Sequence, residues 1–333
     1  MSYILAIESS CDDTSAAIID LNGNVLSNVT ASQKIHEQYG GVVPEVASRK
    51  HQINIIPVVK AAFDKANVNK NDLVAIAVTR GPGLLGSLIV GVSFVKGLAI
   101  SLNIPIIEVN HMQAHVLAHF AEDPKPNFPF LCLTVSGGHT QIVKITSPFE
   151  MEVIGNTIDD AAGEAFDKTG KILGLKYPAG PEIDKRAQKG EVKFEFTEPN
   201  IEGLDFSFSG LKTSILYFLR DRLKEDPQFI DNELDNICAS VQDRIVSILI
   251  NKMRKAIEQT QIKDIAIAGG VSANSGLRNA FEALGKEMNC NVFIPAFQYC
   301  TDNAGMIAVA ALYKFLEGDF VDLSITPNAR MRV

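Results

Sequence analysis

The beginning of the chain carries a pattern that returns 126 residues later. A short apolar run, a small polar turn and a second apolar run fill residues 4–18. The same succession fills residues 130–144, with Ser10 aligned on Ser136. Each copy is typical of a strand, a turn and a return strand. Two copies of one unit indicate an internal duplication. The sequence therefore predicts two α/β domains of similar design, with their hairpin turns facing one cleft.

Strand and helix signals alternate along the rest of the chain, as is typical of an α/β protein. In the first half we expect strands at 4–8, 16–20, 24–32, 73–79 and 106–109, and helices at 44–65, 87–102 and 111–120. In the second half we expect strands at 130–136, 141–146 and 265–268, and helices at 275–284 and 306–316. We expect the last helix to pack against the first domain.

Composition narrows the class of protein. Lys and Arg number 31 against 39 Asp and Glu, a formal net charge of −8. Because affinity for phosphate backbones comes mainly from Lys and Arg, any RNA contact should be confined to one face or shared with a partner.

None of the five cysteines forms a CxxC pair, which favours a reducing compartment. The start of the chain does not resemble a signal peptide. The apolar segment 83–104 includes serines and a lysine, which favours a buried helix over a membrane span. A cytoplasmic protein is predicted.

Two histidines provide the first candidate site. His111 and His115 are four residues apart in a predicted helix, so both imidazoles project from one face, and His119 continues that face. A third ligand must come from elsewhere, and Asp302 is a plausible carboxylate. Two His and one carboxylate leave open positions, as in catalytic zinc or non-haem iron sites. On spacing alone, a histidine-rich surface helix is an equal alternative.

Glycine-rich turns provide the second candidate site, because exposed backbone N–H groups can hold phosphate oxygens. None of the turns matches the Walker or Rossmann pattern, and each taken singly is more simply a tight turn. Several such turns at strand ends of duplicated domains favour a nucleotide cleft. The turns lie at 81–83, 136–140, 179–181 and 269–271.

Three polar segments have two interpretations each. Asp160, Glu164 and Asp167 would share one helix face, either as a solvated helix start or as carboxylates that bind ribose hydroxyls, a metal or water. The segment 8–14 carries Asp12 and is either an ordinary polar turn or a source of Mg²⁺ ligands or a base. The segment 36–51 is either a surface insertion or a substrate-facing loop.

The sequence resembles a known family. The motifs that carry the likeness are IESSCDDTS, YGGVVPEVASRKH, TRGPGLLGSLIVG, NHMQAH, VSGGHTQ, IDDAAGEAFDK, GLDFSFSGLKT, AGGVSANSGLR and YCTDNAGMIA. They run through essentially the whole chain and are similar to those of the TsaD family, which makes threonylcarbamoyladenosine in tRNA. Archaeal and eukaryotic relatives belong to the KEOPS complex, and an older family name is O-sialoglycoprotein endopeptidase.

The resemblance implies an actin-like ATPase (ASKHA) fold, in which two RNase H-like α/β domains flank a nucleotide cleft. It implies an N-terminal domain of residues 1–110 completed by about 303–333. The C-terminal domain, residues 111–302, would carry most metal and nucleotide contacts. The implied reaction moves a threonylcarbamoyl group from threonylcarbamoyl-AMP to the exocyclic amine of the adenosine 3′ to the anticodon. The implied tRNAs read codons that begin with A.

The resemblance also implies the site residues. The metal, Fe²⁺ with Zn²⁺ or Mg²⁺ as alternatives, would be held by His111, His115 and Asp302. The implied adenylate-binding residues are Thr134, Val135, Ser136, Gly137, Gly138, Asp167, Gly180, Asp184 and Asn274. Two positions depart from the common family pattern: Asp13 stands where many members carry Glu, and Thr134 where Leu is frequent.

The implied chemistry needs a polarised carbonyl, a stabilised leaving phosphate and a proton acceptor. A metal ion would serve as Lewis acid, backbone N–H groups at 136–138 would hold the phosphate or oxyanion, and we expect Asp12 to accept the proton. In bacteria the implied partners, besides tRNA, are a paralogous TsaB-like subunit and a TsaE-like ATPase.

Other function classes remain as alternatives. A small-molecule kinase of the same fold, or a non-enzymatic ATPase switch, would use the cleft without needing His111 and His115. A metalloprotease is disfavoured, because no Glu stands between the two histidines as HExxH requires.

Overall fold

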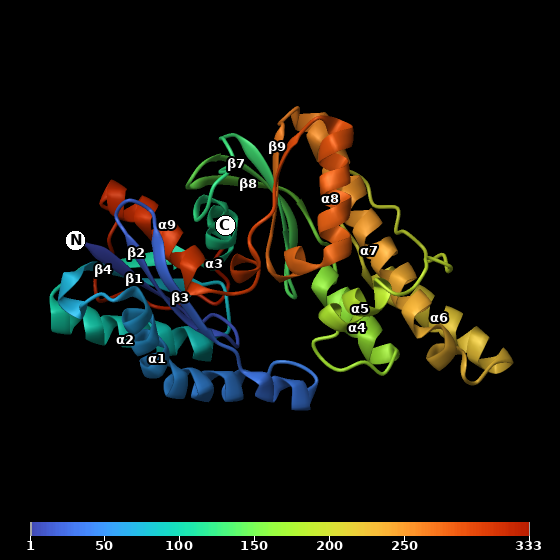
Figure 1. Cartoon of the computed structure of the whole chain (residues 1–333), viewed down its shortest axis with the longest axis horizontal. Coiled ribbons are helices and arrows are strands. Elements are labelled where there is room, and N and C mark those ends of the chain that lie inside the picture. The colour runs from blue at the N-terminus through green and yellow to red at the C-terminus, as the bar shows by residue number, and fades with distance from the viewer. Residues whose placement is uncertain (1, 333) are drawn as a thin grey trace. The chain divides into compact units, whose positions relative to one another are not determined.

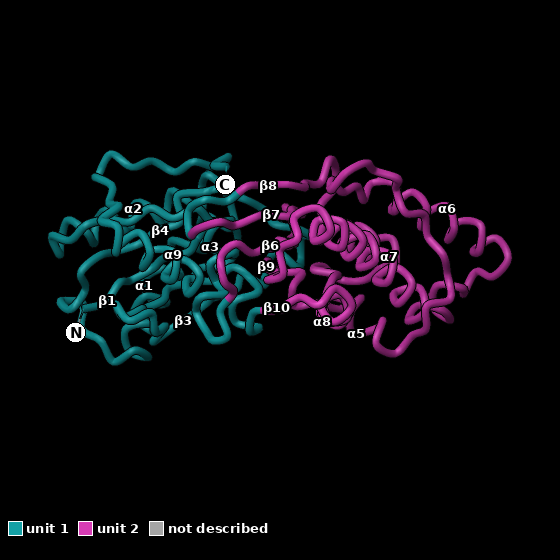
Figure 2. The backbone as a smooth tube through the Cα atoms, turned by 90° about the horizontal axis from the view of Figure 1, so that it is seen from above, with its two compact units in different colours: residues 1–125, 148–151, 295–333 teal, residues 126–147, 152–294 magenta. Residues whose placement is uncertain are grey.

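The computed structural model describes residues 2–332 as two compact units (Figure 2). The first unit comprises the chain up to Lys125, Pro148–Met151, and the chain from Pro295 onward. The second comprises Pro126–Ser147 and Glu152–Ile294. These bounds differ from the expected division at residues 110 and 302. The segment that follows residue 110 and the loop before the last helix both pack within the first unit, so all three expected metal ligands belong there.

The first unit is built on a five-stranded sheet in the order β3-β2-β1-β4-β5. β1 is antiparallel to β2 and parallel to β4, and β4 is parallel to β5. The carboxyl ends of β1, β4 and β5 therefore meet at one edge of the sheet. The strands are β1 (Tyr3–Glu8), β2 (Thr14–Asp20), β3 (Val25–Ala31), β4 (Leu73–Gly81) and β5 (Ile106–Asn110).

Helices cover both faces of this sheet (Figure 1). Successive strand side chains point to opposite faces. Ile4 and Ala6 accordingly pack with α3 (His111–Leu117) and α9 (Ala304–Glu317). Leu5 and Ile7 pack with α1 (Pro44–Ala66) and α2 (Leu85–Leu102). A strand buried on both faces needs an unbroken apolar run, which explains the opening run of the sequence. The expected packing of the last helix on the first domain is confirmed.

The second unit repeats the sheet, with the order β8-β7-β6-β9-β10 corresponding to β3-β2-β1-β4-β5. β6 is antiparallel to β7 and parallel to β9, as β1 is to β2 and β4. The two sheets confirm the predicted duplication. The strands are β6 (Phe130–Val135), β7 (Thr140–Ser147), β8 (Glu150–Asn156), β9 (Asp264–Ala268) and β10 (Asn291–Phe293).

The two units differ in the segment that joins β3 to β4 in the first and β8 to β9 in the second. In the first unit the main element there is α1, whereas the second unit inserts four helices and packs one continuous apolar core around them. The inserted helices are α4 (Ala162–Ile172), α5 (Gly180–Ala187), α6 (Ser209–Glu225) and α7 (Phe229–Thr260), and α8 (Ser275–Met288) follows β9. Short 3-10 helices occupy Lys34–Tyr39, Lys70–Asp72, Ala118–Phe120, Gly270–Ala273 and Phe297–Tyr299.

α2 is long and apolar enough to cross a membrane by length and composition. In the structure its inner residues, among them Val92, Val95 and Ala99, are buried against the first sheet. The core helix of a soluble protein passes the same test of length and composition.

Candidate functional site

A short helix that begins directly after β5 places the two histidines. The Asn110 side chain caps α3 by accepting hydrogen bonds from the backbone N–H groups of Met112 (2.9 Å) and Gln113 (3.2 Å). Asn is among the preferred residues at this position because it satisfies N–H groups that the helix cannot. His111 and His115 therefore lie one turn apart on one face, with ring centroids 4.7 Å apart.

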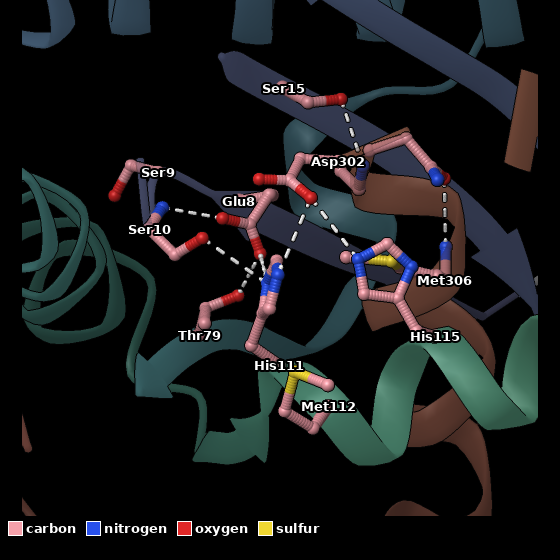
Figure 3. A network of polar contacts seen from close by, with 12 residues as sticks. Glu8, Ser9, Ser10, Ser15, Thr79, His111, Met112, His115, Asp302 and Met306 are labelled. Carbon is pink, nitrogen blue, oxygen red and sulfur yellow. Dashed lines mark hydrogen bonds and ion pairs between the residues drawn. The ribbon is translucent and has the colours of Figure 1, made fainter. Parts of the chain in front are cut away.

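Asp302 reaches these histidines from the loop before α9 (Figure 3). Its Oδ1 lies 3.1 Å from His115 Nε2 and 3.4 Å from His111 Nε2. The loop is held because Asn303 caps α9 at Met306 N and because Ala304 N donates to Ser15 Oγ on β2. One ligand atom from each of the three side chains lies within 4.8 Å of the others. Residues 187 positions apart thus converge as the sequence analysis expected.

The trio fits a divalent cation. Both histidines are buried, each directs Nε2 at the same carboxylate oxygen, and the donor set of two nitrogens and one oxygen suits zinc or ferrous iron. His115 Nδ1 is buried without a hydrogen-bond partner among the described residues. His119 lies in the following 3-10 turn and is not part of the group.

The ionisable side chains at this site shift one another's pKa values. Burial alone would raise the pKa of Asp302, but His111 and His115 hold that pKa far below its usual range. Burial alone would lower the pKa of His111, but Asp302 and Glu8 raise it well above the usual value. The site therefore favours a positive charge between the carboxylates of Glu8 and Asp302. A bound cation would supply that charge.

The turn that carries Asp12 is fastened to the helices beside it. Ser10 O accepts a hydrogen bond from Leu84 N (2.7 Å). Cys11 O accepts from His51 Nε2 (2.9 Å) and from Ser87 Oγ (3.0 Å). Two donors from α1 and α2 thus converge on one carbonyl, which fixes the backbone immediately before Asp12.

Asp13 lies next to Asp12 in this turn and has a shifted pKa. Burial, chiefly, raises the pKa of Asp13 to about 7, and the charges of Asp302, Asp12 and Glu8 raise it further against a hydrogen bond from Ser32. A carboxyl with a pKa near neutrality is suited to proton transfer.

In the segment 36–51 some side chains are buried and others are exposed. His36 and His51 are buried, and His51 Nδ1 lies 2.8 Å from Thr14 Oγ1. Glu45 and Arg49 form an exposed ion pair on α1. His51, expected only as one polar group of a substrate-facing loop, instead supports the turn of residues 9–13.

In the second unit, the predicted phosphate-binding turn joins β6 to β7. It is closed by Ser136 N donating to His139 O (2.8 Å) and His139 N donating to Ser136 Oγ (3.1 Å). A side chain added at Gly137 or Gly138 would meet nothing within 4 Å. At Gly163, the start of α4, an added Cβ would lie 2.6 Å from Ser136 O, so only glycine permits this approach. Thr134 and Val135 lie on β6 and are buried.

The other predicted adenylate residues tie loops of the second unit together. Asp167 accepts a hydrogen bond from Ala179 N (2.7 Å), at the turn that contains Gly180. Asp184 accepts from Ser275 N (3.1 Å) and Ser275 Oγ (2.6 Å). Asn274 caps α8 and donates to Gln242. A continuous chain of contacts therefore links these residues.

The acidic row does not form as expected. Asp160 lies before α4 begins, and it shares Lys168 with Glu164 at 2.6 Å and 2.9 Å respectively. Asp167 instead faces the turn at 179–180. Only Asp167 of the three is therefore associated with the glycine-rich turns.

Comparison with known proteins decides the family. A model described as TsaD, tRNA N6-adenosine threonylcarbamoyltransferase, matches residues 24–309. Relatives bearing that enzyme name are similar over their whole length. That of Christiangramia forsetii is 59% identical over 99% of this chain and 98% of the relative. That of Riemerella anatipestifer is 60% identical over 99% and 97%. That of Porphyromonas gingivalis is 56% identical over 99% and 98%. The chain belongs to the TsaD family.

Solved structures show the fold of this TsaD-family chain. Component A of (R)-2-hydroxyglutaryl-CoA dehydratase from Acidaminococcus fermentans is 15% identical, with a TM-score of 0.56 over 95% of this chain and 99% of that one. Full-length HypF, in its phosphate- and nucleotide-bound form, is 13% identical, with a TM-score of 0.61 over 96% of this chain and 47% of HypF. The predicted actin-like ATPase fold is confirmed.

The sequence analysis missed part of the network around the TsaD-family histidines. Glu8 Oε2 lies 3.1 Å from His111 Nδ1 and accepts a hydrogen bond from Thr79 Oγ1 (2.6 Å). A signal was available: Glu8, Thr79 and His111 each lie within two residues of the carboxyl ends of β1, β4 and β5. Adjacent parallel strands bring such residues to one edge.

Proposed function

We propose that this chain transfers a threonylcarbamoyl group from threonylcarbamoyl-AMP to the N6 amine of the adenosine 3′ to the anticodon, in tRNAs that read codons beginning with A. The amine attacks the carbamoyl carbon, the bond from that carbon to the phosphate oxygen breaks, AMP leaves, and a proton passes from N6 to a base. The full-length likeness to relatives named for this transfer carries the proposal.

The first unit would supply the metal centre. His111, His115 and Asp302 would hold one Fe²⁺ ion, with Zn²⁺ and Mg²⁺ as alternatives. When bound, the ion supplies a Lewis acid for the transfer. The chain's own contribution is a fixed pair of imidazoles, a single shared carboxylate oxygen and a largely buried setting that limits access of water.

The second unit would bind the adenylate. The backbone N–H groups of Ser136, Gly137 and Gly138 would hold its phosphate. The open space around both glycines supports this role. The other contacts are proposed for Thr134, Val135, Asp167, Gly180, Asp184 and Asn274. Because Asp167 and Asp184 already accept backbone hydrogen bonds, their main contribution would be to fix the turns that line the ligand.

Asp12 would accept the proton from N6. This role is supported by the fixed backbone before Asp12, where Cys11 O accepts hydrogen bonds from His51 and Ser87. Asp13 is the direct competitor for this role, because its pKa of about 7 suits a base at neutral pH.

The setting of the reaction is part of the same proposal. We propose that the protein acts in the cytoplasm with a TsaB-like paralogous subunit and a TsaE-like ATPase, which would share the RNA surface of an acidic chain with a net charge of −8.

Reconstitution tests this function against its competitors. The chain would be incubated with the synthase that makes the adenylate, the two partners, ATP, threonine, bicarbonate and unmodified tRNA. Mass analysis of the tRNA nucleosides should show threonylcarbamoyladenosine only when the chain is present. Phosphorylation of a small alcohol or carboxylate with unmodified tRNA would instead identify a kinase. A nucleotide-dependent conformational change without any product would identify a switch.

A further inference from the structure

We propose that Glu8 is a positioning residue, which holds the His111 ring so that its Nε2 atom faces the metal position. The inference rests on the metal centre of the proposed function. It adds a residue that is neither a ligand nor a base, and it explains why a carboxylate is buried behind one histidine.

Glu8 is fully buried at the carboxyl end of β1, and its hydrogen bonds are well defined (Figure 3). Oε1 accepts from Ser10 N (2.5 Å), and Oε2 accepts from Thr79 Oγ1 (2.6 Å). Oε2 also lies 3.1 Å from His111 Nδ1. Two fixed donors leave Glu8 no freedom to turn, so its carboxylate presents an acceptor to His111 from one direction.

The contact determines which nitrogen of His111 keeps its proton when a metal binds. A carboxylate only accepts hydrogen bonds, so the nitrogen that faces it must be the N–H donor. Nδ1 of His111 is therefore protonated, and its Nε2 atom points at Asp302 Oδ1, 3.4 Å away. Once a metal is bound, this arrangement leaves the Nε2 lone pair for the ion. A carboxylate behind a ligating histidine commonly fixes both tautomer and ring orientation in this way.

The second histidine of the centre lacks such support. His115 Nδ1 is buried and has no hydrogen-bond partner among residues 2–332. Its ring lies edge-to-face with the ring of His111 and has Asp302 Oδ1 3.1 Å from Nε2. The two ligands therefore depend on different features, and Glu8 should matter for His111 alone.

Glu8 is separate from the ligand group. The cluster of possible metal-binding atoms comprises His111, His115 and Asp302, and does not include Glu8. Thr79 offers a matched control, because it donates to the same carboxylate oxygen and, among residues 2–332, makes no hydrogen bond of its own with His111. Replacing Thr79 should disturb Glu8 slightly and leave the ring in place.

The test measures Zn²⁺ affinity of the metal-free protein by chelator competition, which needs no activity assay. We expect Glu8→Gln and Glu8→Asp each to weaken Zn²⁺ binding about 10- to 100-fold. Thr79→Val should change it by less than about 3-fold. Glu8→Asp keeps the charge and withdraws the carboxylate from Nδ1, so it separates positioning from simple attraction. Thermal unfolding of each variant shows whether it is folded, and Glu8→Asp serves alone if Glu8→Gln is not.

Three outcomes would overturn the inference. Zn²⁺ binding by Glu8→Asp within about 2-fold of the unmodified chain would mean that Glu8 acts only through its charge. A loss for Glu8→Asp and Glu8→Gln as complete as that for His111→Ala would mean that Glu8 is itself a ligand. No Zn²⁺ or Fe²⁺ binding by the unmodified, folded chain would instead remove the metal centre of the proposed function, and the positioning role with it.

Discussion

The turns that follow β1 and β6 occupy equivalent places in two equivalent sheets, yet they are held in different ways. The first is fastened from outside, because donors on α1, α2 and the segment before α2 bind the carbonyl groups of Ser10 and Cys11. The second closes on itself through Ser136 and His139 and leaves open space around its glycines.

Under the proposed function, this difference would let one duplicated frame support two kinds of chemistry. The fastened turn carries carboxylates in the same unit as the candidate metal ligands, where a fixed geometry is needed for proton transfer and metal binding. The glycine-rich turn offers backbone N–H groups, where close approach of a phosphate is needed. The predictions below test this division, beginning with the largest expected effect.

Asp302→Ala should abolish the chemistry assigned to the first unit. It removes the single oxygen shared by His111 and His115, so we expect transfer to fall by about 10³-fold or more. Adenylate affinity, assigned to the second unit, should change by less than about 3-fold. Single-turnover transfer to tRNA and adenylate binding by calorimetry would be measured side by side. A large loss of adenylate affinity with little loss of bound metal would break the division between the units.

Asp12→Asn and Asp13→Asn form a matched pair within the fastened turn. If Asp12 accepts the proton, its replacement should slow transfer by about 10²- to 10⁴-fold, and Asp13→Asn should have a much smaller effect. The measurement is the single-turnover rate between pH 5.5 and 8.5. The roles would be exchanged if Asp13→Asn gave the larger loss and removed a rise in rate centred near the Asp13 pKa of about 7.

Gly137→Ala and Gly163→Ala probe the glycine-rich turn. The first adds a methyl group to open space, so we expect the fold to be stable and AMP affinity to fall by about 10-fold if phosphate approaches there. The second places a methyl group 2.6 Å from Ser136 O, so it should also destabilise the second unit, by about 1–3 kcal/mol. AMP titration and thermal unfolding measure the two effects. Unchanged AMP affinity in Gly137→Ala would separate the phosphate from this turn.

His51, which holds the turn of residues 9–13, should make the free energy of unfolding modestly dependent on pH. Burial lowers the pKa of His51, so the unfolded chain binds a proton there more readily than the folded chain. Its contribution to stability is therefore present above about pH 6.5, the unfolded value, and is lost as the pH falls through the lower folded pKa. The slope from one such group is at most about 1.4 kcal/mol per pH unit.

Denaturant unfolding at pH 7.5 and pH 5.5 would measure this effect, with His51→Gln as the comparison. The variant should lose stability at pH 7.5 and lose less than the unmodified chain on acidification. Equal losses on acidification in both proteins would contradict the role given to His51.

Much of the fold could be predicted because the central sheet strands β1, β4, β6 and β9 are buried on both faces and appear as apolar runs. The hairpin of β1 and β2 and its copy in β6 and β7 follow from that pattern and from the turn residues between them. Helices α6 and α7 were not predicted. The two compact units also divide the chain at other residues than the expected 110 and 302, since α3 contacts α9 across nearly 200 residues of sequence.

The candidate site shows a similar limit. The spacing of His111 and His115 is a local signal, whereas the choice of Asp302 needed the family motif. Glu8 has the appearance of a polar strand end, and its role depends on Thr79 and His111, which lie 71 and 103 positions away. Only the parallel pairing of β1, β4 and β5 brings these three residues together.

Metal content measured together with transfer tests the account most directly. The unmodified chain and His115→Ala would be purified without oxygen, analysed for iron and zinc, and given tRNA and threonylcarbamoyl-AMP in a single turnover. The account predicts about one ion per unmodified chain with threonylcarbamoyladenosine formed, and a large loss of both in His115→Ala. Full transfer by a metal-free preparation of the unmodified chain would contradict it.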